Sequence, residues 1–160
     1  MHPSAARVRD VARARGVDIE IREFPSGTRT AEDAAGAIGC DVAQIVKSLV
    51  FVVDGEPVLA LVSGANRVDE TLLTSAVGGT RVSRADADTV RDATGFPIGG
   101  VPPFGHPRQL RTCIDPDLLS FDVVWAAAGT PRHVFAAEPA WLASVTGAIE
   151  AAITARPAAR

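Results

Sequence analysis

The chain has 160 residues, of which 47% are hydrophobic and 22% are charged, and its formal net charge at pH 7 is −3. This length and apolar content predict one ordinary domain, spanning residues 1–160, with a core of its own. The net negative charge argues against a domain that holds nucleic acid by phosphate neutralisation alone. A partner that touches only the end of a nucleic acid is still compatible with it.

The sequence contains no uncharged apolar run of about 18 residues and no leader in which charged residues precede an apolar segment. It therefore predicts a soluble cytoplasmic protein without a membrane partner. Cys40 and Cys113 form no CxxC or CxxH pattern, and each is expected to be a small buried residue. The three histidines have no acidic residue at metal-ligand spacing, so we expect no metal.

The N-terminal part predicts helices alternating with strands. Apolar residues recur at helical spacing over 4–15, whereas the alternation of apolar and charged residues over 17–24 is typical of a half-buried strand. A second helix is expected over 30–38, with Thr30 and Asp33 in an approximate capping box, and a short turn over 42–45. Two apolar runs, 47–53 and 58–63, flank Asp54-Gly55, and this arrangement is the strongest short-range signal for a β-hairpin.

The C-terminal part predicts shorter elements. Helices are expected over 69–77, 86–94 and from Pro139 to about 155, and strands over 80–82, 111–114, 123–129 and 133–137, with a turn or short helix at 115–119. Hairpins and irregular loops join most strands. The predicted fold class is therefore α+β, a single domain with a curled, barrel-like mixed sheet surrounded by helices.

The loop over 93–106, ATGFPIGGVPPFGH, is rich in glycine and proline. Gly95 and Gly100 have Walker spacing, but no Lys-Ser or Lys-Thr follows and no GxGxxG occurs, so nucleotide hydrolysis and dinucleotide binding are disfavoured and no cofactor is expected. Gly99 and Gly100 permit positive φ and close approach of a ligand, while the prolines fix φ. Such a backbone suits an oxyanion hole or a positioned water, or it is a structural loop at the end of a sheet.

Lys47 is the only lysine among 16 basic residues. Strand alternation places it on the same face as Leu49, Phe51 and Val53. Its ammonium either extends to solvent or lines the mouth of a cavity, where it would meet a phosphate or a polar ester.

The segment 126–135, AAAGTPRHVF, joins a strand to Arg132 and His133 through a turn. A lone histidine is more often structural than catalytic. No GxSxG nucleophile elbow is present, and no Ser-His-Asp arrangement can be found.

Four segments in this order resemble the YbaK-like family, which comprises free-standing aminoacyl-tRNA deacylases similar to the editing domain inserted in bacterial prolyl-tRNA synthetases. They are TAEDAAGAIGCDVAQIVKSLVF, LVSGANRVD, GFPIGGVPPFGH with Gly99 and Pro103 in a GxxxP pattern, and AAAGTPRHVF. The resemblance covers about 30–147.

The resemblance implies a pocket for an aminoacyl group on the terminal adenosine of a tRNA, and hydrolysis of its ester. It implies catalytic roles for Lys47, Gly99, Gly100 and Pro103. The residues implied to bind substrate are Asn66, Arg67, Val101, His106, Gly129, Thr130 and His133. The implied partners are the acceptor end of aminoacyl-tRNA and an aminoacyl-tRNA synthetase, with the protein acting as a monomer or a dimer.

Several alternatives are open at this point. The Gly129-Thr130-Pro131 turn differs from some relatives, which leaves cysteine, alanine and other small residues as the amino acid removed. The same pocket would serve a non-catalytic module that binds aminoacyl-tRNA or a synthetase. A weaker hypothesis makes Lys47 a Schiff-base nucleophile on a carbonyl substrate.

Overall fold

One mixed β-sheet organises the protein, whose computed structural model describes residues 1–25 and 30–155. The strand order is β1-β7-β6-β2-β3-β5-β8, and β4 pairs with β2 outside this path. The strands are β1 (Ile21–Glu23), β2 (Ile45–Val53), β3 (Glu56–Ser63), β4 (Val82–Arg84), β5 (Arg111–Ile114), β6 (Val124–Ala127), β7 (His133–Ala137) and β8 (Ile149–Glu150). The helices are α1 (Pro3–Ala14), α2 (Ala31–Ile38), α3 (Glu70–Ala76), α4 (Ala87–Thr94) and α5 (Pro139–Thr146), with short 3₁₀ turns at Val42–Gln44 and Pro116–Ser120.

The expected capping and turn residues define most of the element ends. The side chains of Thr30, Asp69 and Asp86 each accept a backbone N–H at the start of a helix, from Asp33, Leu72 and Thr89 respectively. In the hairpin between β2 and β3, Asp54 and Gly55 both have positive φ, of 50° and 82°. This conformation matches the twist of the two strands, and it confirms the hairpin prediction.

The two faces of the sheet carry separate clusters of the core. On one face, residues of β2, β3 and β5 pack with α1, α4, α5 and the Gly/Pro loop; members of this cluster include Val8, Val46, Val50, Leu59, Leu61, Val90, Phe96, Ile114 and Leu142. On the other face, alternate residues of the same strands pack with α3; they include Phe51, Val53, Val58, Ala60, Val62, Leu73 and Cys113. Period-two alternation along β2 and β3 therefore places each residue on one face or the other.

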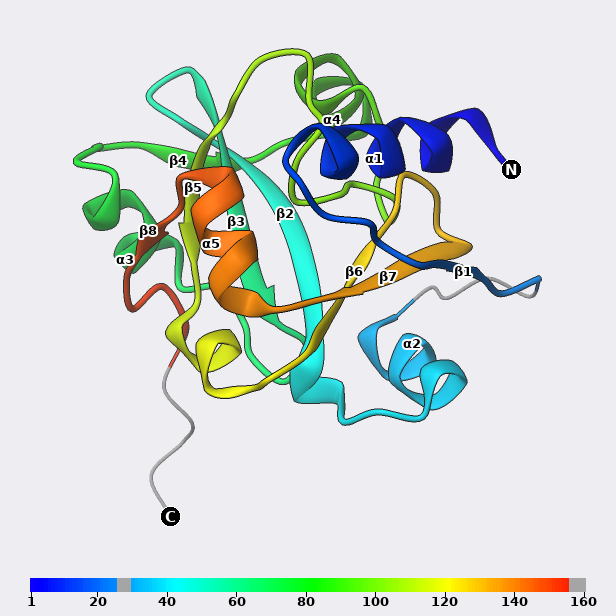
Figure 1. Cartoon of the computed structure of the whole chain (residues 1–160). Coiled ribbons are helices and arrows are strands. Elements are labelled where there is room, and N and C mark those ends of the chain that lie inside the picture. Colours follow the sequence, from blue (N-terminus) through cyan, green and yellow to red (C-terminus); the bar gives the residue numbers. More distant parts are fainter. Residues whose placement is uncertain (26–29, 156–160) are drawn as a thin grey trace.

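The sheet is curled and mixed, as predicted, but it does not close into a barrel. β1 and β8 are its two ends. In Figure 1, β6, β7 and β1 run obliquely to β2, β3 and β5, and α2 lies at the lower right, beside β6 and below β7 and β1.

Several predicted elements have other bounds in the structure, and in three of them the cause is visible. The last helix stops at Thr146 instead of about 155, because Gly147 adopts φ +63° and its N–H returns to Ser144, after which β8 pairs with β5. The first strand is confined to 21–23, the only residues that lie opposite β7. β4 starts at Val82 instead of 80, since the Asp54 carboxylate binds the backbone N–H groups of Thr80 and Arg81.

A gap in the sheet lies beside the middle of β2. On one side β2 pairs with β3 along its whole length. On the other side it pairs with β6 only at Ile45 and Val46, and with β4 only from Phe51 to Val53. The segment between them, 47–50, has no strand beside it there among the described residues, and we call this opening the sheet gap.

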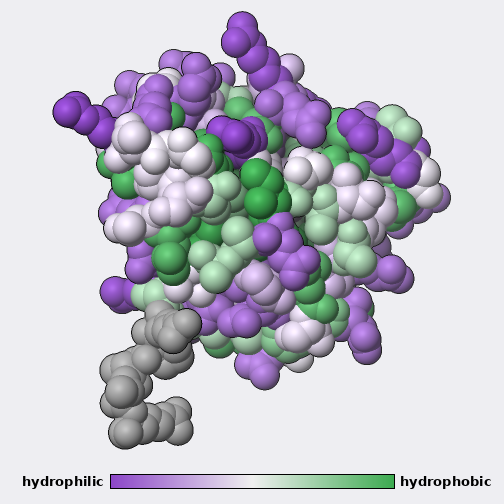
Figure 2. Space-filling view, turned by 90° about the vertical axis from the view of Figure 1, so that its left-hand side faces the viewer, coloured by the Kyte–Doolittle hydropathy of each residue, from purple (hydrophilic) through white to green (hydrophobic). Residues whose placement is uncertain are grey.

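The face that carries α3 and β8 is turned toward the viewer in Figure 2, where apolar residues gather near the centre and polar residues surround them. Exposed apolar side chains on these two elements are Leu72 and Ile149. Among the helices of the described residues, none has the length and apolar character required to span a bilayer.

Candidate functional site

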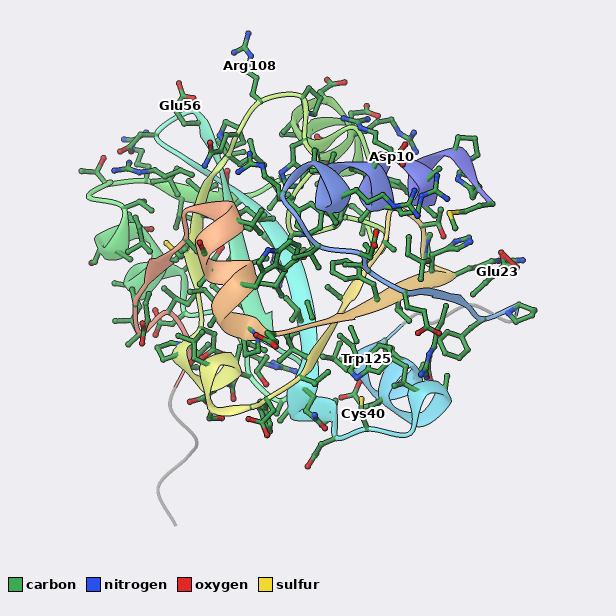
Figure 3. All side chains as sticks on the ribbon, in the orientation of Figure 1. Asp10, Glu23, Cys40, Glu56, Arg108 and Trp125 are labelled. Atoms are coloured by element: carbon green, nitrogen blue, oxygen red, sulfur yellow. The ribbon has the colours of Figure 1, made fainter. Side chains whose placement is uncertain are left out.

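A pocket of about 410 Å³ occupies the sheet gap. Residues of both faces of β2 line it, so the pocket passes through the plane of the sheet instead of lying on one face. The rest of its wall comes from α2, the start of the Gly/Pro loop, β6 and the turn into β7; representative residues are Ala31, Ala34, Ile98, Gly99, Val101, Trp125, Thr130 and His133. Figure 3 shows Trp125 on β6, close to α2.

Lys47 lies in the wall of this pocket, half-buried, on the face of β2 that the alternation predicts. Its Nζ donates a hydrogen bond to the backbone carbonyl of Asn66. Burial lowers the pKa of Lys47 below its ordinary value, an effect that Glu32 and Asp115 oppose and Arg67 reinforces. The ammonium is therefore held at the pocket and not extended into solvent.

A buried carboxylate, Asp115, holds the residue to which Lys47 is hydrogen-bonded. Asp115 is 1% exposed, and its Oδ2 accepts hydrogen bonds from the backbone N–H of Ser63 at 3.1 Å and from Asn66 Nδ2 at 2.8 Å. Asn66 Nδ2 also donates to Asp117 at 2.8 Å. These hydrogen bonds hold Asn66 in place. The backbone carbonyl of Asn66 is therefore positioned to orient the Lys47 ammonium.

His133 also lines the pocket and is 5% exposed. Its Nδ1 lies 2.5 Å from Thr130 Oγ1, and its Nε2 lies 3.0 Å from a carboxylate oxygen of Glu23. The Thr130 hydroxyl accepts the N–H of Arg132, which leaves its own proton for Nδ1. We assign from this network the tautomer in which Nε2 carries the hydrogen and donates to Glu23.

The Gly/Pro loop reaches the pocket at Gly99 and Val101. Gly99 has φ +85°, and the N–H of Gly100 donates to Pro97 at 2.9 Å, which makes a tight turn. Gly100 does not line the pocket: a Cβ at this residue would stand 2.8 Å from the Thr130 Cα, so its role here is close packing on the Gly129-Thr130 backbone. Gly129 in turn packs on the backbone of Ser4 in α1.

Two of the predicted site residues lie elsewhere. Pro103 and His106 line a second pocket of about 360 Å³, between α1 and the end of α5, with Arg7 and Gln109. His106 Nε2 is 2.8 Å from the carbonyl of Pro102. Of the predicted site residues, the pocket is lined by Lys47, Gly99, Val101, Thr130 and His133. Asn66 and Arg67 interact with Lys47 without lining the pocket, Gly100 and Gly129 pack beside it, and Pro103 and His106 are separate from it.

His106 makes the stability of the fold depend on pH. Burial lowers the pKa of His106 below its ordinary value of 6.5, Arg7 adds to the effect, and the hydrogen bond with Pro102 opposes it. Below about pH 6.5 the unfolded chain binds a proton at this residue that the folded chain disfavours, so stability is lost as the pH falls through this range. Thermal unfolding at pH 7.5 and 5.5 should show a smaller acid loss for His106→Gln than for the wild type. An equal loss in the two proteins would contradict this assignment.

Some residues at the pocket could not be predicted from the sequence. Asp115 follows a strand and precedes a proline, which signals only a turn, while its burial under Asn66 depends on the tertiary fold. Trp125 and the small residues of α2 line the pocket because α2 packs against β6, a contact between distant parts of the sequence. The sequence offers no local signal for either.

No cluster of three or more His, Cys, Asp or Glu side chains able to hold a metal ion occurs within 1–25 and 30–155. Cys113 is buried and Cys40 is half-buried, and burial raises the pKa of both thiols. Neither cysteine lines the pocket at the sheet gap.

Comparisons with known proteins identify the family model and the relatives that this chain matches. The model of the aminoacyl-tRNA editing domain family matches residues 25–144. A proline–tRNA ligase of Maridesulfovibrio salexigens is 38% identical over 101 residues, which is 63% of this chain but only 17% of the ligase, so the chain spans a small part of the curated ligases that it matches. An uncharacterized protein of Bacillus subtilis, YwhH, is 28% identical over 75% of this chain and 76% of its own length.

A solved structure of similar size has the same fold. The crystal structure of a proposed trans-editing enzyme for prolyl-tRNA synthetase matches with a TM-score of 0.92 and 47% sequence identity, over 98% of this chain and 99% of the other.

Proposed function

Because this chain belongs to the aminoacyl-tRNA editing domain family, we propose that it is a trans-acting deacylase that hydrolyses the ester of mischarged tRNA. The amino acid removed would be small, such as cysteine or alanine, and the tRNA would be that for proline. The protein would contact the acceptor end of the tRNA in the cytoplasm, and would act on the product of an aminoacyl-tRNA synthetase.

The observation that carries this proposal is the convergence of Lys47, His133 and the Gly99 turn on one pocket at the sheet gap. A half-buried ammonium there suits the phosphate or ester oxygens of the terminal nucleotide. No carboxylate is among the pocket-lining residues that the structure describes, and most of the wall is apolar. Such a wall favours a small uncharged side chain over a basic one.

Ester hydrolysis demands little from the protein. Water attacks the carbonyl carbon, the bond to the ribose oxygen breaks, and the proton from water ends on that oxygen. The aminoacyl ester is already activated, so fixed dipoles that stabilise the developing oxyanion and orient a water can supply the catalysis. His133 would act through its fixed ring as a wall that sorts amino acids by size.

Deacylation of a panel of mischarged tRNAs tests the proposal. Catalytic amounts of the protein are incubated with alanyl-, cysteinyl- and prolyl-tRNA for proline, and release of the labelled amino acid is followed over time. We expect many turnovers with alanyl- or cysteinyl-tRNA and none with prolyl-tRNA. Saturable binding without turnover for every member would instead favour a non-catalytic module.

A further inference from the structure

The backbone of β2 has a fixed direction at the sheet gap. In an antiparallel pair, alternate residues turn both backbone polar groups toward the partner strand. The carbonyl of Ile45 accepts the N–H of Gly64, so Ile45, Lys47 and Leu49 turn their groups toward β3. The residues between them, Val46, Ser48 and Val50, turn theirs toward the opposite edge.

Toward this edge, Val46 and Val50 have backbone partners, whereas Ser48 has none that the structure describes. Val46 lies beside β6, and the carbonyl of Val50 accepts the N–H of Ala85 at 3.3 Å. Among the described residues, neither β4 nor β6 reaches Ser48. Its N–H and C=O therefore open into the pocket that it lines.

The side-chain hydroxyl of Ser48 also lacks a hydrogen-bond partner in the described part of the chain. Its Oγ is buried and has no hydrogen-bond partner within the part of the chain that the structure describes. Buried polar groups in folded proteins are nearly always paired, and an unpaired group calls for a ligand or a function. Ser48 thus has a hydroxyl and two backbone groups without a partner among the described residues.

We propose that the backbone of Ser48 binds the aminoacyl group of the substrate as a neighbouring strand would bind it, the N–H donating to the ester carbonyl and the C=O accepting from the α-ammonium. This inference rests on the proposed deacylase function and adds the residue that holds the reacting group.

The chemistry of the two partners is complementary. An aminoacyl ester carries a donor and an acceptor on either side of one carbon, as a strand residue does, so it can complete the ladder that the gap interrupts. Lys47 and Ser48 line the same pocket, so one bound substrate can contact both residues. Because every aminoacyl ester has these two groups, Ser48 recognises the class of substrate and leaves the choice of side chain to the rest of the wall.

Backbone ester substitution at Ser48 tests the N–H. The α-hydroxy analogue of serine replaces this N–H by oxygen and keeps the side chain. The matched control is the same substitution at Val52, whose backbone faces β4 opposite Ser83. Each change also makes the carbonyl of the preceding residue a weaker acceptor, and in both variants this carbonyl faces β3. The two variants therefore differ only in the N–H that is lost.

The two variants should show opposite patterns. The Ser48 ester should lower kcat for alanyl-tRNA hydrolysis by about 100-fold, which is the size expected for loss of one oxyanion donor, and should melt above the Val52 ester. The Val52 ester should keep kcat within about 2-fold and melt at a lower temperature, since it loses a ladder hydrogen bond. Equal kcat values for the Ser48 ester and the wild type would overturn the proposal.

Propionyl-tRNA tests the C=O of Ser48, because this ester lacks the α-ammonium. Each enzymatic rate is divided by the spontaneous rate of the same ester, which removes the difference in intrinsic reactivity. We expect this ratio to be at least about 10-fold lower for propionyl-tRNA than for alanyl-tRNA, the effect of losing a charged hydrogen bond. Equal ratios would refute the ammonium contact.

A binding measurement separates failure of this inference from failure of the proposed function. The probe is 3′-deoxy-3′-alanylamino-adenosine, in which an amide replaces the ester, titrated into ¹⁵N-labelled protein. We expect the Ser48 amide resonance to move downfield and that of Val52 to stay unchanged. If the wild type hydrolyses no tRNA, the deacylase proposal fails while this shift still supports the Ser48 site; turnover without a Ser48 shift overturns the inference alone.

Discussion

Replacement of Lys47 by methionine is expected to lower kcat/KM for deacylation of mischarged tRNA by at least about 100-fold, with little change in melting temperature. Methionine keeps a side chain of similar length in the pocket wall and removes the charge together with the hydrogen-bond donor. The hydrogen bond to the Asn66 carbonyl is lost, but this carbonyl stays positioned, because Asp115 and Asp117 hold the Asn66 side chain. Single-turnover kinetics and thermal unfolding measured by circular dichroism check both parts.

Arg111→Met is the matched control for this variant. Arg111 is an exposed cation on β5 and does not line the pocket, so the loss of its charge should leave the deacylation rate within about 2-fold. Lys47→Arg adds a second comparison: if a positive charge alone suffices, it restores activity, whereas a requirement for a compact ammonium leaves it inactive. Full activity of Lys47→Met would remove Lys47 from the catalytic site.

Gly100→Ala should destabilise the fold by about 3 kcal/mol and lower the melting temperature by about 6–12 °C. The added Cβ would stand 2.8 Å from Thr130 Cα and 3.0 Å from the carbonyl oxygen of Gly129, and both atoms belong to backbone that side-chain rotation cannot move. The turn that carries Thr130 must shift, and it would take His133 with it. A loss of deacylase activity is expected to accompany the loss of stability.

Gly36→Ala serves as the comparison for a harmless methyl group. Gly36 lies within α2, and a Cβ there would meet no atom within 4 Å. Alanine favours a helix interior, so this variant should be as stable as the wild type or more stable by up to about 1 kcal/mol. Equal melting temperatures for Gly100→Ala and Gly36→Ala would contradict the close packing that we describe.

Local sequence signals predicted the elements well where local forces decide them. Asp54-Gly55 specifies its turn through backbone conformation, and Thr30 caps its helix through one hydrogen bond, so both are visible in a few residues. The final helix is shorter than its sequence pattern predicts, because Gly147 ends it and the short strand after it exists only through its pairing with β5.

The candidate site was predicted in part for the same reason. The alternation along β2 placed Lys47 on its face, and the resemblance to the YbaK-like family brought Gly99, Thr130 and His133 into one site. Pro103 and His106 follow Gly99 closely in sequence, but they line the second pocket, a separation that the sequence alone does not reveal. The isolation of Ser48 depends on where β4 and β6 end, which no local pattern encodes.

The shortness of the sheet gap bears on the behaviour of the protein at high concentration. An open strand edge normally invites pairing with another molecule, and long exposed edges lead to self-association. Here β6 and β4 cap the opening at Val46 and at Phe51, so the free edge is too short for an incoming strand to form a ladder. The sheet gap can therefore present unpaired backbone groups to a small ligand without itself offering a template for aggregation.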